Sequence, residues 1–281
     1  MSIVNVFLPT EPDDHVLHLK AFAKGVKKSG DQVNLTPIEE GYKTCDVAVV
    51  FGMGKRQVPQ SHHRGAIIYE HRFRERKPVV LMERGFIKRG EYYGAALDGL
   101  NGLGYFGNAN SPSDRWNNLG VKIKRYRDPD EGDHVLVCGQ VPWDASVQHT
   151  DHMAWCFNTV ERLQLMTKRE IRFRPHPEVK HLDYKMPVSI NTWEQDLLDC
   201  HAIVTFASTS SALAVLDGIN IFSMDAGSIA YPISNKELTP ELIEDPVQYD
   251  RKQWAYDLAY AQWTAEEFET GQAWRQLRDE K

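Results

Sequence analysis

Short apolar runs alternate with helix-period segments along this chain, and that alternation constrains its fold more than any other feature. In the first half, the predicted strands are residues 3–9, 31–37, 45–52 and 78–85, and the predicted helices are 15–30 and 62–77. Strands that alternate with helices form parallel sheets with both faces covered. The first half is therefore predicted to be an α/β domain.

The alternation resumes after residues 86–130, a stretch rich in Gly, Asn and aromatic residues that we expect to be a functional loop. The later segments are, in order, a strand at 134–140, a helix at 153–168, a strand at 169–177, a helix at 192–200 and a strand–helix–strand unit at 201–225. A tryptophan-rich helical segment ends the chain. This order predicts three parts: Rossmann-like domains at 1–125 and 126–250, and a helical tail, 251–281, that packs on the first domain.

Composition places the chain among ordinary soluble proteins, with 42% hydrophobic and 26% charged residues in 281. No run approaches the roughly 18 apolar residues of a membrane span. The N-terminus reads as a strand and not as a signal peptide. The four cysteines are dispersed and form no CxxC pair, which is typical of reduced thiols in a cytosolic protein. We therefore expect a cytoplasmic protein with no membrane association.

The net charge of −6 is unevenly distributed. Residues 1–130 hold 20 Lys and Arg against 15 Asp and Glu, whereas 131–281 hold 13 against 24. Within 51–90 the count is 10 against 3. A basic front half on an acidic protein indicates an anionic partner for that half. The alternative is a solvated charged helix, carried by the segment EHRFRERK.

The segment IRFRPHP, residues 171–177, fixes cationic side chains at the end of a strand. Arg172 and Arg174 offer planar forks suited to phosphate or carboxylate, and two prolines hold His176 beyond the strand. Open α/β sheets bind ligands at the carboxyl ends of their strands. The segment therefore predicts an anion site, and its alternative is a structural ion pair with a nearby carboxylate.

Two further turns follow predicted strands in the second half. Ser208, Thr209, Ser210 and Ser211 precede a helix, where hydroxyls and free backbone N–H groups can bind an anion. The alternative is an ordinary N-cap. Gly139 and Gln140 form the turn after the strand at 134–140, followed by Trp143, which would stack on a base or sugar or fill an interdomain groove.

The order of these turns, GQ, RPHP and then STSS before a helix, resembles the C-terminal domain of GT-B glycosyltransferases. RPHP followed by a serine-rich helix start is similar to bacterial capsule-type sugar transferases. The stretch LDGLNGLGYFGNANSPSDRW, together with PWDASVQH and LAYAQWT, resembles phage-encoded glycosyltransferases that act on 5-hydroxymethylpyrimidines in DNA. The resemblance spans most of residues 80–270.

The resemblance implies a GT-B fold: two Rossmann-like domains whose parallel sheets face a cleft, with a C-terminal helix crossing back to the first domain. The second domain would hold a nucleotide-sugar, a UDP-sugar being the expected donor, although the glutamate motif typical of UDP binding is absent. The expected donor contacts are Gly139, Gln140, Arg172, Arg174, His176, Ser208, Thr209, Ser210 and Ser211. Basic side chains and helix N-termini often neutralise the leaving diphosphate in this fold, so no cofactor or metal site is predicted. A divalent metal stays possible, and His149 and His152 lie three residues apart but lack further evident ligands.

An inverting transfer also needs a general base for the acceptor hydroxyl. The candidates are Asp13 and Asp14 after the first strand, Glu83 after the fourth and Asp98 in the glycine-rich stretch. We favour Asp98, because a neighbouring glycine allows close approach of an acceptor. The alternative for Asp98 is a turn aspartate that binds its own backbone.

The resulting hypothesis is a glycosyltransferase that moves a sugar to a hydroxymethylated pyrimidine in phage DNA, in the host cytoplasm if the chain is phage-encoded. Double-stranded DNA would bind the basic front half through phosphate contacts. The expected cations are Lys55, Arg56, Arg64, Arg72, Arg74, Arg76, Lys88 and Arg89, and the expected aromatic contacts to a flipped base are Tyr92, Tyr93, Tyr105 and Phe106. One alternative is a capsule, lipid or small-molecule acceptor, and another is a non-catalytic nucleotide-binding protein of the same fold.

Overall fold

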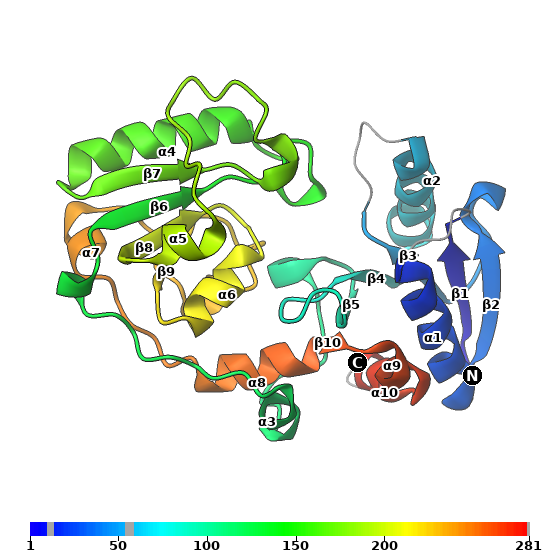
Figure 1. The fold of residues 1–281 in the computed structure, drawn as a ribbon. Coiled ribbons are helices and arrows are strands. Elements are labelled where there is room, and N and C mark those ends of the chain that lie inside the picture. The colour runs from blue at the N-terminus through cyan, green and yellow to red at the C-terminus, as the bar shows by residue number, and fades with distance from the viewer. Residues whose placement is uncertain (10–13, 54–58, 280–281) are drawn as a thin grey trace. The chain divides into compact units, whose positions relative to one another are not determined.

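The computed structural model describes residues 1–9, 14–53 and 59–279, and it divides into two compact units. Unit 1 comprises Met1–Leu119 together with Ala255–Lys281, and unit 2 comprises Gly120–Trp254 (Figure 1). The sequence had placed these boundaries after residues 125 and 250. Among the described residues, no helix combines the length and apolar character needed to cross a membrane.

Unit 1 is built on a six-stranded sheet in the order β10-β5-β4-β3-β1-β2. Its strands are β1 (Ile3–Leu8), β2 (Gln32–Pro37), β3 (Val47–Phe51), β4 (Val79–Arg84), β5 (Tyr93–Leu97) and β10 (Gln262–Trp263). The four strands predicted from the sequence are parallel to one another, as expected. β5, in the stretch predicted as a loop, pairs antiparallel with β4, and β10, in the tail predicted as helical, pairs antiparallel with β5 and so runs in the direction of the other four strands.

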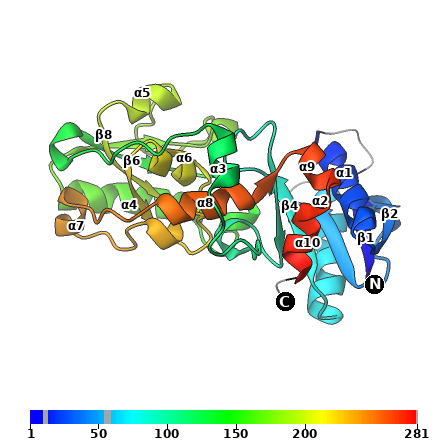
Figure 2. The ribbon, with the colours of Figure 1, turned by 90° about the horizontal axis from the view of Figure 1, so that it is seen from below.

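Helices cover both faces of this sheet, so unit 1 has three layers. α1 (Asp14–Lys28) packs on one face with α9 (Ala265–Glu269) and α10 (Gln272–Asp279), as Figure 2 shows. α2 (Pro59–Ile68) and a π-helical turn, η2 (Tyr69–Arg74), lie against the other face. Alternate residues of each strand serve the two cores: Val47 and Val49 face α1, whereas Ala48 and Val50 face α2.

The C-terminal tail packs into unit 1, where α9 contacts α1 and β10 contacts the segment after β4. At Gly25 a Cβ atom would lie 2.0 Å from the carbonyl oxygen of Phe268, so only glycine lets α1 and α9 approach this closely. Gln262 on β10 is fully buried, and its Oε1 accepts hydrogen bonds from the backbone of Phe86 at 2.8 Å and Ile87 at 2.9 Å. The tail is therefore part of the unit 1 core.

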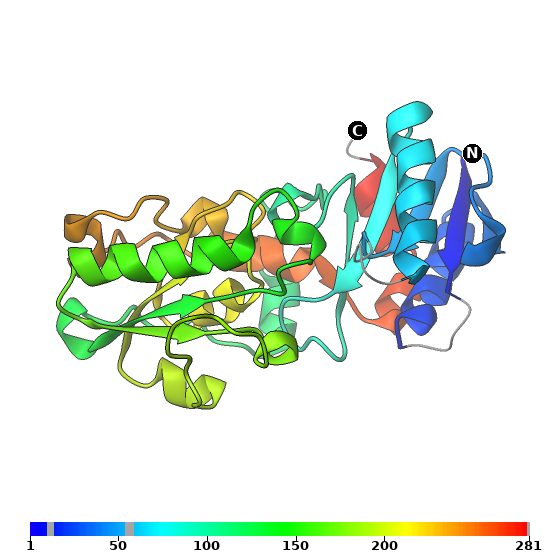
Figure 3. The same ribbon diagram turned by 90° about the horizontal axis from the view of Figure 1, so that it is seen from above.

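Unit 2 is built on a four-stranded, fully parallel sheet in the order β7-β6-β8-β9. Its strands are β6 (His134–Cys138), β7 (Glu170–Arg174), β8 (Cys200–Thr205) and β9 (Asn220–Ser223). α4 (His152–Met166) lies on one face with α7 (Pro240–Glu244), and α5 (Trp193–Leu197) and α6 (Ser210–Leu216) lie on the other (Figure 3). Each connection between strands carries a helix, and the four carboxyl ends therefore meet at one edge.

Two further short helices lie where the chain passes from one unit to the other. α3 (Asp114–Leu119) ends the first segment of unit 1, and α8 (Lys252–Tyr260) carries the chain out of unit 2 and into β10. Thr192 is the N-cap of α5, and its side chain accepts from the backbone of Gln195 in a capping box.

Candidate functional site

The carboxyl edge of the unit 2 sheet gathers the segments singled out in the sequence. Cys138 pairs with both Arg174 and Thr205, and Thr205 pairs with Ser223, so the four strands end in register. The loops that follow these ends are 139–144, 175–179, 206–209 and 224–228. Three predicted groups of donor contacts, each separated from the next by 31 residues of sequence, therefore share one edge.

Gln140 links two of these loops. Its Oε1 accepts a hydrogen bond from the backbone N–H of Ala207 at 2.7 Å, and its Nε2 donates to Ser146 Oγ at 2.9 Å. Its own backbone N–H donates to His152 Nε2 at 2.8 Å. Gln140 is 8% exposed, so these contacts fix the loop after β6 against the loop after β8. The neighbouring Gly139 packs on Phe173, where an added Cβ would come within 3.1 Å of the ring.

Both arginines of the IRFRPHP segment are held by carboxylates. Arg172 donates to Glu170 at 2.7 and 2.8 Å. Arg174 donates to Asp196 Oδ2 at 2.7 Å and to the carbonyl of Asn191 at 2.8 Å. The ion-pair alternative therefore describes both side chains, and their positive charges are already partly compensated in this structure.

Asp196, the partner of Arg174, has no exposed side-chain surface. Desolvation by burial raises its pKa, but hydrogen bonds from Ser189, Arg174 and Asn191 act in the opposite direction and hold the pKa below its ordinary value. The carboxylate is therefore charged and fully coordinated. Because α5 carries Asp196, the ion pair with Arg174 fastens α5 to the end of β7.

His176 and the serine turn present polar groups at the edge. His176 is half-buried and begins a short 3-10 turn, where its Nδ1 accepts from the backbone of Glu178 at 3.3 Å. The Oγ atoms of Ser208 and Ser210 are 2.8 Å apart, and both residues are half-buried. Thr209 occupies the N-cap of α6 with no side-chain capping bond. The hydroxyls of this turn are oriented by one another and stay at the surface.

Ser211 differs from its neighbours because it is fully buried. Its Oγ donates to the carbonyl of Ser208 at 2.8 Å and lies 3.2 Å from Ser228 Oγ. Ser223 Oγ donates to the same Ser228 hydroxyl at 3.0 Å. Ser211 therefore joins the start of α6 to the loop after β9, and its buried hydroxyl fixes the position of the serine turn.

The described candidates for a catalytic base in unit 1 lie at opposite edges of its sheet, and Asp13 lies outside the described residues. Glu83 is near the carboxyl end of β4, and its Oε1 accepts from the backbone of Arg84 at 2.9 Å. Asp14 begins α1, which follows the carboxyl end of β1, but its side chain lies outside the described residues. Asp98 follows antiparallel β5 and therefore lies at the amino end of β4.

Asp98 has the geometry of a turn aspartate. Its φ is +62°, its Oδ1 accepts from the backbone N–H of Val79 at 2.9 Å, and its own N–H donates to the Val79 carbonyl at 2.8 Å. The sequence pattern favoured Asp98 as the base because of its neighbouring glycines. The structure instead favours the alternative, because antiparallel β5 carries Asp98 away from the edge where parallel strands bind ligands.

His149 and His152 have separate roles and do not form a joint metal site. His152 is buried, and its Nε2 accepts from Gln140; desolvation lowers its pKa to about 4, which keeps the imidazole neutral. His149 instead contacts Asp225 Oδ2 through Nε2 at 3.0 Å. Within 1–9, 14–53 and 59–279, no cluster of three or more His, Cys, Asp or Glu is arranged to hold a metal ion.

The His149–Asp225 contact was missed in the sequence, although Asp225 was visible as the residue that ends the last predicted strand.

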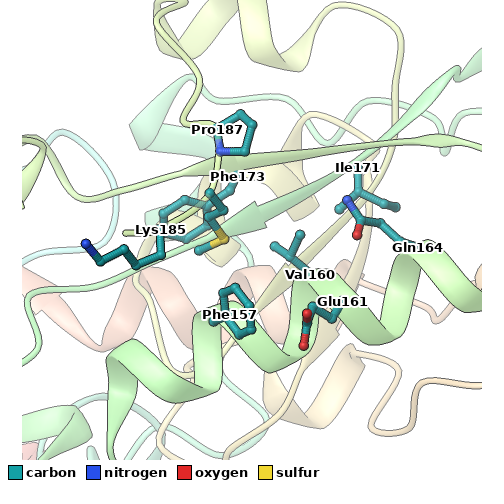
Figure 4. Close-up of a pocket in the computed structure, with 9 residues that line it drawn as sticks. Phe157, Val160, Glu161, Gln164, Ile171, Phe173, Lys185 and Pro187 are labelled. Carbon is teal, nitrogen blue, oxygen red and sulfur yellow. The ribbon is translucent and has the colours of Figure 1, made fainter. Parts of the chain in front are cut away.

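The structure also has a pocket of about 250 Å³ between α4, β7 and residues 185–187 (Figure 4). Its lining is Phe157, Val160, Glu161, Gln164, Ile171, Phe173, Lys185, Met186 and Pro187. None of the predicted donor contacts lines this pocket.

No family model and no curated protein matches the sequence. Among solved structures, the chain is similar to Thermosulfurimonas dismutans KpsC, beta Kdo 2,7 transferase, with a TM-score of 0.53 and 13% identity over 95% of this chain and 97% of that one. A second similarity is to the beta Kdo 2,4 transferase of the same KpsC, with a TM-score of 0.54 and 17% identity over 91% and 89%. The predicted GT-B fold is confirmed. At these identities the likeness establishes the fold alone.

Proposed function

We propose that this protein is a glycosyltransferase that binds a nucleotide-sugar at the carboxyl edge of the unit 2 sheet. The observation that carries the proposal is the convergence of the 139–140, 175–176 and 208–211 turns at that edge. A topological edge of this kind is where open α/β sheets bind nucleotides. Similarity to two transferases along nearly the whole chain supports the same conclusion.

The polar groups at this edge suit a leaving phosphate. Ser208, Thr209 and Ser210 offer hydroxyls, and His176 follows β7 at the same edge, whereas the backbone N–H groups of Ser208 and Ser210 already donate to side chains of the turn. Donors aimed at the oxygen that gains charge lower the barrier to transfer. Arg172 and Arg174 contribute positive potential, which each shares with a carboxylate. Gly139 and Gln140 would shape the floor of the site.

A saccharide acceptor is the first candidate. Two similar structures are Kdo transferases, and the RPHP and serine-turn pattern is similar to capsule-type transferases. We therefore propose a capsule-type glycan as acceptor and unit 1 as the part that binds it. For the base that takes the acceptor proton, the position of Glu83 at the carboxyl edge of the unit 1 sheet makes it the stronger candidate than Asp98.

Hydroxymethylated DNA is the second candidate, and one surface favours it. Tyr69 and Phe73 on the π-helical turn are 57% and 63% exposed, and the guanidinium of Arg72 lies over the Phe73 ring at 5.7 Å. Exposed aromatic rings beside arginines are typical of nucleic-acid contacts. However, Tyr93 and Phe106 are buried, so the expectation that these two rings stack on a flipped base is wrong for this structure.

The pool of cations expected to bind DNA is also partly engaged. Arg74 pairs with Glu70 at 3.0 Å on the same helical turn. Lys55 and Arg56 lie outside the described residues. The charge excess of residues 51–90 therefore supports a DNA acceptor less strongly than the sequence alone indicated.

A transfer assay tests the proposal and separates the two acceptors. The full chain is incubated with a panel of nucleotide-sugars, beginning with UDP-sugars, and with either capsule-type oligosaccharides or 5-hydroxymethylcytosine DNA. We expect release of one nucleotide that depends on the oligosaccharide and is lost in Ser208→Ala/Ser210→Ala. Release that depends on modified DNA, and that falls steeply with salt, would select the second candidate. No turnover and no nucleotide binding would refute both.

A further inference from the structure

His149 and Asp225 form a histidine–carboxylate pair at the carboxyl edge of unit 2, joining residues 76 positions apart in the sequence. The imidazole is 56% exposed, whereas the carboxylate is 23% exposed. The histidine is therefore the member of the pair that faces solvent. Because Nε2 is directed at Asp225, Nδ1 is the ring nitrogen that remains for a ligand.

Asp225 is fixed through its backbone and through both oxygens of its carboxylate. The backbone N–H of Asp225 donates to the Phe206 carbonyl at 3.1 Å, which continues the pairing of β8 with β9 beyond the strand ends. Its Oδ1 accepts from the backbone of Gly227 at 2.7 Å, and its Oδ2 faces His149. The His149 ring lies against the Phe206 ring with centroids 5.4 Å apart. The imidazole is therefore held in place by a rigid carboxylate and an aromatic neighbour.

The same loop positions the serine turn. Residues 225–228 run from Asp225 to Ser228, whose hydroxyl is 3.2 Å from that of Ser211 at the start of α6. Phe206, which packs on His149, is two residues before Ser208. One loop and one strand end thus hold both the exposed imidazole and the half-buried hydroxyls of the serine turn. The imidazole and the hydroxyls are therefore positioned by the same two segments at the carboxyl edge of the sheet.

We propose that His149, oriented by Asp225, is a donor-phosphate contact that binds the phosphate attached to the sugar; this inference rests on the proposed function. Arg172 and Arg174 are each paired with a carboxylate, so a further donor at the edge would strengthen the binding of a phosphate. A protonated imidazole donates from both nitrogens, to Asp225 through Nε2 and to the ligand through Nδ1. Asp225 is a positioning residue that acts through His149.

The role of His149 in the transfer follows from the charges. The bond between the anomeric carbon and the phosphate oxygen breaks, and its electron pair stays on that oxygen. The acceptor oxygen forms the new bond to the same carbon and gives its proton to the general base. The imidazolium retains its own proton and stabilises the charge that the phosphate gains. No metal, oxidant or reductant enters this balance.

Calorimetric titration of the full chain with uridine, UMP and UDP, and with cytidine, CMP and CDP, tests the inference. We expect the wild type to bind one phosphorylated probe more tightly than its nucleoside. His149→Gln should weaken the phosphorylated probe about tenfold or more and leave the nucleoside unchanged, because only a charged hydrogen bond is removed. Asp225→Asn should reduce the same preference. Arg162→Gln, on the last half of α4 and away from the carboxyl edge, is the matched control for loss of a surface cation.

The outcomes separate this inference from the proposed function. If the wild type prefers the phosphorylated probe and His149→Gln keeps that preference, the inference is wrong and the donor proposal stands. If His149→Gln weakens nucleoside and nucleotide equally, its role is structural and the inference is again wrong. Binding of no nucleotide by the wild type would overturn both. Circular dichroism and the melting temperature of each variant confirm that it is folded.

Discussion

Arg174 Nη1 lies 2.7 Å from Oδ2 of Asp196, a carboxylate whose side chain has no exposed surface. The sequence drew attention to Arg174 as an anion-binding residue, and the structure gives its charge an internal partner. A buried carboxylate that loses its partner is left desolvated and uncompensated. The pair therefore decides how substitutions in the IRFRPHP segment should be interpreted.

Arg174→Ala is expected to destabilise the protein by about 3–5 kcal/mol, because it leaves Asp196 buried without its cation. Asp196→Asn removes the charge, so the double variant should be less destabilised than the sum of the two single variants. Urea unfolding of the four proteins measures this coupling. Additive free energies would contradict it. Loss of nucleotide binding in Arg174→Ala is informative only after this comparison.

The stability of unit 2 should fall with acid through His152. Burial lowers the pKa of His152 to about 4, from about 6.5 in an unfolded chain, so the unfolded state binds the proton first as the pH falls. This contribution is fully present above about pH 6.5 and is lost progressively toward pH 4. It amounts to about 3 kcal/mol for a shift of this size. Unfolding free energies of wild type and His152→Gln at pH 7, 6, 5 and 4 should converge, and parallel curves would contradict the assignment.

Gln262→Leu should destabilise unit 1 by about 2–4 kcal/mol. The substitution keeps the approximate volume but leaves the backbone N–H groups of Phe86 and Ile87 buried without their acceptor. Gln272→Leu, at an exposed position at the start of α10, is the matched control and should change stability by less than about 0.5 kcal/mol. Equal effects of the two substitutions on the melting temperature would show that the buried amide contributes nothing.

Gly25→Ala should destabilise the protein by about 1–3 kcal/mol, although alanine is the better helix former. The added Cβ would lie 2.0 Å from the Phe268 carbonyl and would force α1 away from α9. Gly65→Ala in α2 is the control, because its Cβ meets no atom within 4 Å, and it should stabilise by about 0.5–1 kcal/mol. Chemical denaturation measures both, and stabilisation by Gly25→Ala would refute the close approach of the helices.

The sequence was sufficient for the order of strands and helices, because the hydrophobic period of a segment is a local property. It placed the parallel strands of both units and the three turns at the carboxyl edge of the second sheet. It failed at β5 and β10, which pair with each other across more than 160 residues. A two-residue strand such as β10 has no period of its own, so only its partner makes it a strand.

The partners of the polar side chains were decided by the tertiary structure alone. Whether Arg174 faces a ligand or Asp196 depends on where α5 docks, and the antiparallel direction of β5 places Asp98 at the edge opposite Glu83. The contact between His149 and Asp225 exists because the segment after β6 reaches past the end of β8 to the loop after β9 at the same edge of the sheet. Sequence by itself thus determined which residues stand at strand ends, through local hydrophobic patterning. Strand order and packing, which bring distant segments together, decided which of those residues meet.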